Sequence, residues 1–133
     1  IREMTAYLNP TESSYLRLGE KKAPRYITWS PQNRAQLIRS PAAQGEYKRM
    51  ELRSPDPTVN PYVAYALLIY AGLDGIRRGL TPPEPVNVNL YTADVSVTGA
   101  LEQLPSSLTE ARAIASRSSF IQNVLPKGML FEG

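Results

Sequence analysis

The chain has 133 residues, of which 42% are hydrophobic and 20% charged, a composition typical of one folded domain and not of a disordered segment. Its net charge of +3 comes from 15 basic and 12 acidic residues, an imbalance too weak to indicate a nucleic-acid-binding surface. Cysteine and histidine are both absent from the sequence, which excludes disulfides, thiolate metal sites and imidazole bases. Any chemistry must therefore use carboxylates, arginines, lysines and hydroxyls.

The first part of the chain is predicted to hold a short turn, a charged loop and a small sheet. Residues 6–24 are expected to form a helical or irregular turn that leads into a charged loop closed by Ala23-Pro24. Three strand candidates follow within residues 25–53, each bounded by turn residues: Arg25–Ser30, Gln36–Ser40 and Tyr47–Arg53. Because the connections between them are short, antiparallel neighbours are favoured.

A long helix is predicted over about residues 60–78. Asn60 and Pro61 form a helix start, with Asn as the cap and Pro at the first helical position. The segment Tyr62–Leu73 is apolar almost all round, which is typical of a buried helix. Gly79 just beyond the basic last turn predicts its end.

The remainder is predicted to be a loop followed by one more helix. Pro82, Pro83 and Pro85 exclude regular structure at the start of residues 81–106, which are expected to be loop-like. The second helix, over about residues 107–125, starts with a serine and a glutamate three positions later, which form a capping-box pair.

Neither end of the chain resembles a targeting or membrane segment. Residues 1–5 lack the basic-then-apolar pattern of a signal peptide, and the longest apolar run, residues 62–72, falls far short of the roughly 20 residues that cross a bilayer. We therefore expect a cytoplasmic protein without membrane contact. Since the chain begins with Ile and ends in a polar, glycine-containing stretch, we expect a piece of a longer protein.

Charge alternates along the third strand candidate. Successive side chains of a strand point to opposite faces, so Arg49, Glu51 and Arg53 are predicted to project together. Such a face can be a solvated ladder of individually weak salt bridges. It can equally be a binding face, with arginines holding phosphate or carboxylate oxygens and Glu51 ligating a hard cation. The alternation alone leaves both interpretations open.

Three further arginines favour the binding interpretation. Arg17 precedes the charged loop, Arg34 follows a turn, and Arg39 lies in the middle strand candidate. Short connections would bring these side chains near the third strand, where so many positive charges repel one another unless anions lie among them. Phosphoryl transfer requires this combination of arginines with a carboxylate-bound metal.

Several motifs resemble, in order and spacing, the C-terminal part of the glutamine synthetase catalytic domain. They are Asn9-Pro10-Thr11, Ser14-Tyr15-Leu16-Arg17-Leu18, Ala23-Pro24, Asn33-Arg34, Ile38-Arg39, Arg49-Met50-Glu51-Leu52-Arg53-Ser54-Pro55-Asp56-Pro57, Asn60-Pro61-Tyr62 and Ala71-Gly72-Leu73-Asp74-Gly75-Ile76. The resemblance is dense from Asn9 to Ile76 and thins after residue 81. It implies an α+β fold, with antiparallel strands and helices packed on one side, in which residues 1–133 form a single partial domain.

The resemblance also implies a function and residue roles. The longer enzyme would use ATP to phosphorylate the side-chain carboxylate of glutamate, and ammonia would then displace the phosphate. At the matching positions, Arg17, Arg34 and Arg53 would bind substrate, and Arg34 and Arg53 would also act in catalysis. Arg39 and Arg49 would bind the nucleotide, and Glu51 would ligate one Mg²⁺ or Mn²⁺ ion.

One departure from the family pattern leaves the nucleophile open. Family members commonly place a glutamate before the Ala-Pro of the flexible loop, where it helps to deprotonate ammonium, but this chain has Lys22, with Glu20 the nearest acid. A glutamate–amine ligase of the γ-glutamyl polyamine type is therefore the alternative. The family's other metal ligands and its N-terminal domain lie upstream of Ile1, so the chain alone is expected to be inactive, and the intact enzyme to form a large ring.

Two other classes of protein fit the residues less well. A non-catalytic structural relative would have no reason to concentrate Glu51 and the arginines. A nucleic-acid-binding module is disfavoured because the basic residues alternate with acids and lack an aromatic stacking surface. Tyr91 lies where some bacterial members accept a regulatory nucleotide, but the residues after it depart from that pattern, so we interpret it as an ordinary loop tyrosine.

Overall fold

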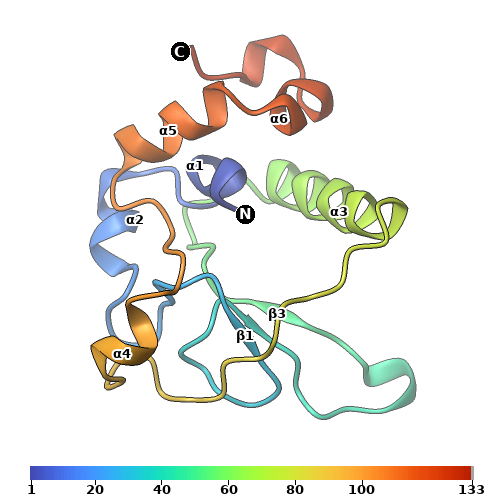
Figure 1. Ribbon diagram of the computed structural model, residues 1–133. Coiled ribbons are helices and arrows are strands. Elements are labelled where there is room, and N and C mark those ends of the chain that lie inside the picture. The colour runs from blue at the N-terminus through green and yellow to red at the C-terminus, as the bar shows by residue number, and fades with distance from the viewer. Residues whose placement is uncertain (133) are drawn as a thin grey trace. The chain divides into compact units, whose positions relative to one another are not determined.

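The computed structural model describes residues 1–132, and the chain divides into two compact units (Figure 1). The first, here called the helical unit, combines Ile1–Tyr15, Asp56–Pro83 and the chain from Pro105 on. The second, here called the strand unit, combines Leu16–Pro55 and Glu84–Leu104. Each unit is thus assembled from segments that are far apart in the sequence.

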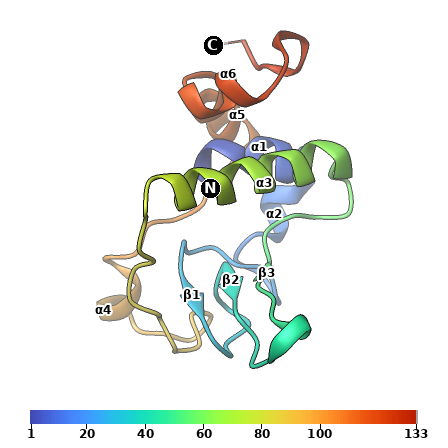
Figure 2. The ribbon, with the colours of Figure 1, turned by 90° about the vertical axis from the view of Figure 1, so that its right-hand side faces the viewer.

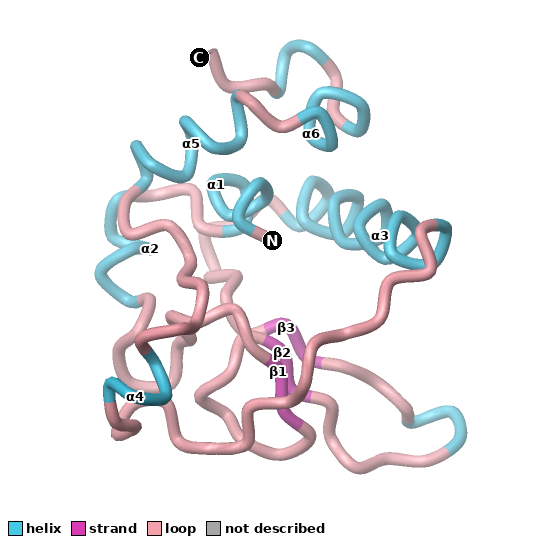
Figure 3. The backbone as a smooth tube through the Cα atoms, viewed as in Figure 1, coloured by secondary structure: helices cyan, strands magenta, loops and turns pink. Residues whose placement is uncertain are grey.

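Helices and short connections form the helical unit (Figure 3). Its elements are the 3₁₀ helix η1 (Arg2–Met4), α1 (Thr5–Leu8), α3 (Pro61–Arg77), α5 (Leu108–Ser116), α6 (Ser119–Val124) and the 3₁₀ helix η3 (Lys127–Met129), and α2 (Glu12–Arg17) runs from this unit into the strand unit. Both α5 and α3 pack against α1 (Figures 1 and 2). The buried side chains of Leu8, Leu67, Ala111 and Ile121 form the centre of this core.

α3 follows the local signals in the sequence at both ends. The Asn60 side chain accepts hydrogen bonds from the backbone N–H groups of Tyr62 and Val63, and Pro61 opens the first turn. Gly79, with φ of +61°, lies just beyond the last turn, in the left-handed region that glycine adopts without steric cost. No helix within residues 1–132 combines the length and apolarity needed to cross a bilayer.

The expectation that this helix is buried all round is wrong. Only Ala64 and Leu67 of α3 are fully buried, whereas Tyr62 is 85% exposed and Ile69 62% exposed. The physical reason is that α3 contacts its own unit along one face, so its second apolar face meets solvent in this structure.

The helix expected over residues 107–125 is divided into α5 and α6. Ser107 caps α5 by accepting from Glu110 N–H, as predicted, but the Glu110 carboxylate reaches back to Ser106 rather than to Ser107. The division falls at a polar run around Arg117, because serines compete for backbone groups and favour caps over helix interiors. There Ser118 accepts from Ile121 N–H and begins α6.

The strand unit holds a three-stranded sheet in the order β1 (Trp29–Ser30), β2 (Ile38–Arg39) and β3 (Glu51–Leu52) (Figure 2). β2 and β3 are antiparallel, but β1 and β2 are parallel, which corrects the expectation of antiparallel neighbours throughout. With strands of two residues, the chain must travel back only about 7 Å, so the loop between β1 and β2 suffices for a parallel return. The α+β fold class is confirmed, with a mixed sheet.

The distant segment of residues 84–104 completes the strand unit. Val86 N–H donates to Trp29 O at 2.9 Å, and Leu104 N–H donates to Arg25 O at 2.9 Å. The buried Gln36 side chain donates to the backbone oxygens of both Val86 and Val88. The segment also contains a short helix, α4 (Val95–Thr98), where the sequence predicted only loop; the Asp94 side chain caps it by accepting from Ser96 N–H.

Candidate active site

The pairing of β2 with β3 places a carboxylate between two guanidinium groups. Arg39 lies opposite Glu51 in the register, and its Nη2 donates to Glu51 Oε2 at 2.9 Å. Arg53, two residues further along the chain on the same face, donates through Nη1 to the other carboxylate oxygen, Oε1. Both oxygens of Glu51 are therefore engaged by arginines from neighbouring positions of the sheet.

This arrangement keeps Glu51 ionised. The hydrogen bond from Arg39, and then the bond from Arg53, hold the pKa of the Glu51 carboxyl below its ordinary value, against a partial desolvation that acts in the opposite direction. The two arginine side chains are only 14% and 10% exposed, while that of Glu51 is 36% exposed. The carboxylate thus borders solvent, and the guanidinium groups lie beneath the surface.

Arg53 and Arg17 form hydrogen bonds to neighbouring chain segments. Arg53 Nη2 donates to Lys22 O at 2.9 Å, so one guanidinium group joins β3 to the charged loop. Arg17, at the end of α2, donates through Nη2 to Ser54 O just after β3. Arginine suits both positions because its planar fork offers five donors in fixed directions.

The charged loop of residues 19–23 is a tight turn held from several sides. Gly19 N–H donates to Ala23 O at 3.2 Å and Ala23 N–H donates to Glu20 O at 3.0 Å. Lys21 has a φ of +55°, which is uncommon for a residue other than glycine. The Tyr91 hydroxyl also donates to Ala23 O at 3.1 Å, so the segment after residue 84 contacts the base of this loop.

A cavity of about 370 Å³ lies between this loop and β3. Its lining contains four basic and two acidic side chains, and it is formed by Arg17, Glu20, Lys21, Lys22, Ala23, Glu51, Leu52 and Arg53. The surplus of positive charge favours an anionic occupant, because guanidinium and ammonium groups bind carboxylate and phosphate oxygens with charge-assisted hydrogen bonds.

The structure brings some of the predicted site residues together and leaves others apart. Arg17, Glu51 and Arg53 line the cavity, and Arg39 reaches Glu51 from β2. Arg34 is exposed in the turn after β1, and Arg49 is exposed and donates to Tyr47 O at 3.3 Å. Glu51 and Arg53 bond each other, as the predicted shared face requires, whereas Arg49 lies before the regular strand, which is shorter than expected and begins at Glu51.

Two contacts of the site were not predicted. The pairing of Arg39 with Glu51 depends on the register between β2 and β3, which no local sequence signal gives. The bond from Arg53 to the Lys22 carbonyl involves a backbone oxygen, which every residue carries, so the identity of Lys22 offers no signal for it.

The residues described here do not form a metal site by themselves. Within residues 1–132 no group of three or more acidic side chains converges, and both Glu51 oxygens already accept from arginines. The adjacent guanidinium groups also repel a divalent cation. Glu51 could serve as one oxygen ligand only if carboxylates from outside the described residues joined it.

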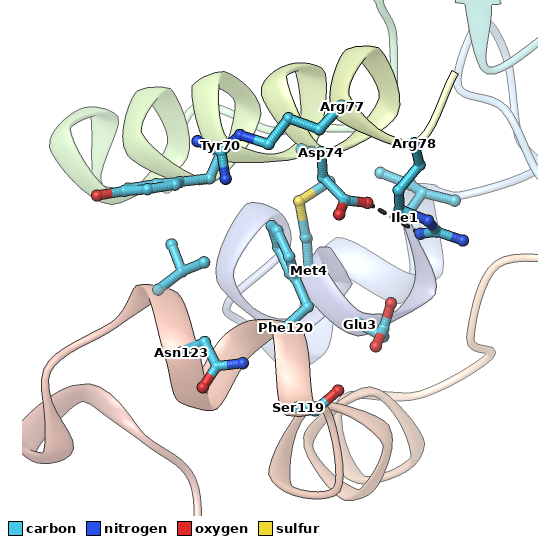
Figure 4. A pocket seen from close by; sticks show the side chains of 12 residues that line it. Ile1, Glu3, Met4, Tyr70, Asp74, Arg77, Arg78, Ser119, Phe120 and Asn123 are labelled. Carbon is cyan, nitrogen blue, oxygen red and sulfur yellow. Dashed lines mark hydrogen bonds and ion pairs between the residues drawn. The ribbon is translucent and has the colours of Figure 1, made fainter. Parts of the chain in front are cut away.

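A second cavity, of about 650 Å³, lies in the helical unit between α3, η1 and α6 (Figure 4). Tyr70 and Asp74 of α3, with Arg78 just after it, form one wall, and Arg78 Nη1 donates to Asp74 Oδ2 at 3.0 Å. Phe120 and Asn123 of α6 lie on the opposite side. None of the predicted site residues lines this cavity, so we place the candidate active site in the strand unit.

Comparisons with known proteins identify the family. The family described as glutamine synthetase, catalytic domain, matches residues 1–132. The glutamine synthetase of Methanosarcina mazei is 45% identical over 128 residues, which cover 94% of this chain and 29% of that protein. The glutamine synthetase of Thermotoga maritima is 47% identical over 113 residues, which cover 83% of this chain and 26% of that protein.

Solved structures show the same fold. A GmaS/ADP complex superposes with a TM-score of 0.81 at 30% identity, over 95% of this chain and 30% of that one. GmaS without ligand superposes with a TM-score of 0.77 at 33% identity. The chain thus spans less than a third of the length of the curated relatives it matches. Since the family match extends over nearly every residue, the chain belongs to the glutamine synthetase family and represents part of its catalytic domain.

Proposed function

We propose that the longer protein containing this chain uses ATP to join ammonia to glutamate through γ-glutamyl phosphate. The observation that carries this proposal is the Glu51 carboxylate held between Arg39 and Arg53 beside a basic cavity, in a chain of the glutamine synthetase family. A solvated salt-bridge ladder would leave the arginines exposed, whereas these two side chains are mostly buried.

The chemistry has two steps, and both place negative charge on oxygen atoms. A side-chain carboxylate oxygen of glutamate attacks the γ-phosphorus of ATP, and ADP leaves. The nitrogen of ammonia then attacks the acyl carbon, phosphate leaves, and the nitrogen gives up a proton to a base. Positioned guanidinium groups stabilise such developing charge without reorganising during the reaction.

We assign the residue roles on the family resemblance, together with the geometry. Arg17 and Arg53, which line the cavity, bind the glutamate substrate, and Arg53 also stabilises the acyl phosphate. Arg34 shares the substrate and catalytic roles, while Arg39 and Arg49 bind the nucleotide. The ADP bound by GmaS, which is 30% identical to this chain, supports a nucleotide site. A Mg²⁺ or Mn²⁺ ion would neutralise phosphate charge, with Glu51 as one ligand among carboxylates from outside residues 1–132.

A glutamate–amine ligase is the second candidate, and Lys22 favours it. Lys22 lines the cavity at the position where the resemblance puts an acidic residue. A lysine there repels ammonium rather than attracting it, so a different amine, or a base from elsewhere, would complete the second step.

The experiment that tests both candidates is an assay of the full-length protein with glutamate, ATP, Mg²⁺ or Mn²⁺, and either ammonia or a panel of amines. We expect ADP release that depends on glutamate and on one nucleophile, and formation of the matching γ-glutamyl amide. Ammonia as the preferred nucleophile supports the first candidate, and a larger amine supports the second. Absence of glutamate-dependent ADP release with every nucleophile would reject both.

We base three further proposals, on assembly, location and the activity of this chain alone, on the same family membership. We infer that the intact enzyme associates with copies of itself into a large ring in the cytoplasm and that this chain alone does not turn over. Size-exclusion chromatography with light scattering on the full-length protein tests the assembly.

A further inference from the structure

The charged loop is held at its closing end by two side chains from distant segments. Arg53 of β3 donates to Lys22 O at 2.9 Å, and the Tyr91 hydroxyl donates to the next carbonyl, Ala23 O, at 3.1 Å. Arg53 lines the cavity of the candidate site. Tyr91 comes from the segment of residues 84–104 and has no role in the proposed function. Its bond to the loop therefore calls for a separate explanation.

The loop has few contacts of its own to keep its shape. Residues 20–22 are exposed, and Lys21 has a φ of +55°. A residue other than glycine keeps such a backbone conformation only where its surroundings hold it there. Inside the loop, the turn is closed by the backbone bonds from Gly19 N–H to Ala23 O and from Ala23 N–H to Glu20 O. Contacts from outside the loop therefore help to decide whether it keeps this shape.

Tyr91 is itself firmly placed. The preceding residue, Leu90, is buried, and the Asn89 side chain accepts a hydrogen bond from Tyr91 N–H at 3.0 Å. Partial burial raises the pKa of the Tyr91 hydroxyl above its ordinary value of 10.0, although the charge of Arg53 acts in the opposite direction. The hydroxyl thus stays protonated at neutral pH and remains a donor to the loop.

We propose that Tyr91 is a positioning residue of the candidate site, whose hydroxyl, through Ala23 O, holds the charged loop in the conformation that lines the cavity. This inference rests on the proposed function, in which the cavity receives glutamate and the nucleophile while Arg39 and Arg49 bind the nucleotide. Tyr91 lies outside the lining of the cavity, so it acts through the loop and not on the substrate. Loss of its hydroxyl should weaken binding in the cavity and leave nucleotide binding unchanged.

Steady-state kinetics of the full-length enzyme test the proposal. Tyr91→Phe removes only the hydroxyl, and Tyr47→Phe removes the same group from a side chain that is 69% exposed and lies outside the cavity lining. We expect Tyr91→Phe to raise KM for glutamate and for the preferred nucleophile roughly fivefold, the factor that corresponds to one neutral hydrogen bond, while KM for ATP stays within about twofold. Tyr47→Phe should change none of them. A Tyr91→Phe enzyme in which KM for glutamate is unaltered, or in which every KM rises equally, would overturn the proposal.

Amide hydrogen exchange gives a second readout that does not depend on activity. The backbone N–H groups of Gly19 and Ala23 donate within the turn, so their exchange becomes faster when the turn opens. In the full-length protein, we expect residues 19–23 to exchange roughly fivefold faster in Tyr91→Phe than in Tyr47→Phe. The midpoints of thermal unfolding of the two variants should agree within about 2 °C.

Two results of the exchange experiment would contradict the proposal. Equal exchange of the loop in both variants would show that the hydroxyl does not hold it. A clearly lower unfolding midpoint for Tyr91→Phe would show a general loss of stability instead of a local one. If the unmodified enzyme releases no ADP in a glutamate-dependent way, the proposed function fails, whereas the exchange comparison still decides whether Tyr91 holds the loop.

Discussion

At the scale of single residues, Glu51 shows which of its contacts a sequence pattern can predict. Alternation along a strand is a local rule, and it correctly put Glu51 and Arg53 on one face. The second partner, Arg39, could not be found in this way because cross-strand pairing is set by register, which depends on residues outside the strand. Arg49 lies outside the regular strand, which begins only at Glu51, so alternation along a strand does not fix its direction.

Replacing Arg53 with lysine should damage activity more than its chemical similarity suggests. The guanidinium group of Arg53 bonds the Glu51 carboxylate and the Lys22 carbonyl together, which a single ammonium group cannot reproduce in the same geometry. We expect kcat of the full-length enzyme to fall roughly 10²-fold, as when one preorganised donor is removed. ADP release measures this, and Arg117→Lys, at an exposed helix end, should retain full activity. An Arg53→Lys enzyme with more than a third of the original kcat would contradict the assigned role.

The lowered pKa of Glu51 predicts a pH dependence of stability. A carboxyl whose folded-state pKa is depressed stabilises the fold above its ordinary pKa of 4.5, and this contribution is lost as the pH falls through the folded-state value. Between pH 6 and pH 3, Glu51→Gln should therefore lose less stability than the unmodified protein. The midpoint of urea unfolding at a series of pH values checks this. The difference should be partial, because the pKa of Glu110 is also lowered, by its bonds to Ser106.

Gly19, in the charged loop, and Gly45, outside it, form a matched pair of positions for testing how tightly this loop is packed. Both have positive φ, at +88° and +59°, so an alanine at either position costs about 1 kcal/mol of backbone strain. At Gly19 a Cβ would also lie 2.5 Å from Arg25 Nε, while at Gly45 nothing lies within 4 Å. Gly19→Ala should thus displace the Arg25 guanidinium, which donates to Leu18 O, and cost about 1 kcal/mol more. Equal free energies of unfolding for the two variants would show that Arg25 moves away freely.

At the scale of elements, local signals predicted helices better than strands. The start of α3 followed from Asn60 and Pro61 because a cap and a first-turn proline act within a few residues. The parallel pairing of β1 with β2 could not be predicted, since strands of two residues are defined by hydrogen bonds to distant segments rather than by their own pattern. The break between α5 and α6 was missed because the apolar periodicity continues across it.

The break between α5 and α6 depends on Ser118. Its buried hydroxyl accepts from Ile121 N–H and donates to Glu3 Oε1 at 2.6 Å, which joins the start of α6 to η1. Ser118→Ala should destabilise the protein by about 1–2 kcal/mol, since both a helix cap and the hydrogen bond from the Ser118 hydroxyl to Glu3 are lost. Ser116→Ala, which removes one bond to Ala113 O, should cost less than about 0.5 kcal/mol. Urea unfolding of both variants tests the difference, and a cost for Ser118→Ala no larger than for Ser116→Ala would count against the cap.

At the scale of the whole molecule, the described residues supply mainly positively charged groups to the candidate site. The cavity has four basic side chains but only two carboxylates, and within residues 1–132 no acidic cluster completes a metal site. The family resemblance implies that the other metal ligands lie outside this chain, and this stays a prediction. The electrostatics of the described residues agree with a half-site that supplies mainly the groups for anions.

The isolated chain should accordingly release no ADP from ATP above the background rate, with or without glutamate and divalent metal. The full-length enzyme under the same conditions serves as the positive control. Saturable, glutamate-dependent turnover by residues 1–133 alone would show that the described residues already contain every essential group.

The interleaving of the two units has a consequence for synthesis on the ribosome. Neither unit is continuous in sequence, since Glu84–Leu104 returns to the strand unit and the chain from Pro105 on returns to the helical unit. Pairings across such long intervals form late, because the intervening chain must first be closed into loops. A nascent chain that has reached Pro83 therefore contains all of α3 but neither unit in full. Until the residues after Pro105 are made, the sides of η1 and α1 that pack against α5 stay uncovered, and that interval is when a chaperone would be needed most.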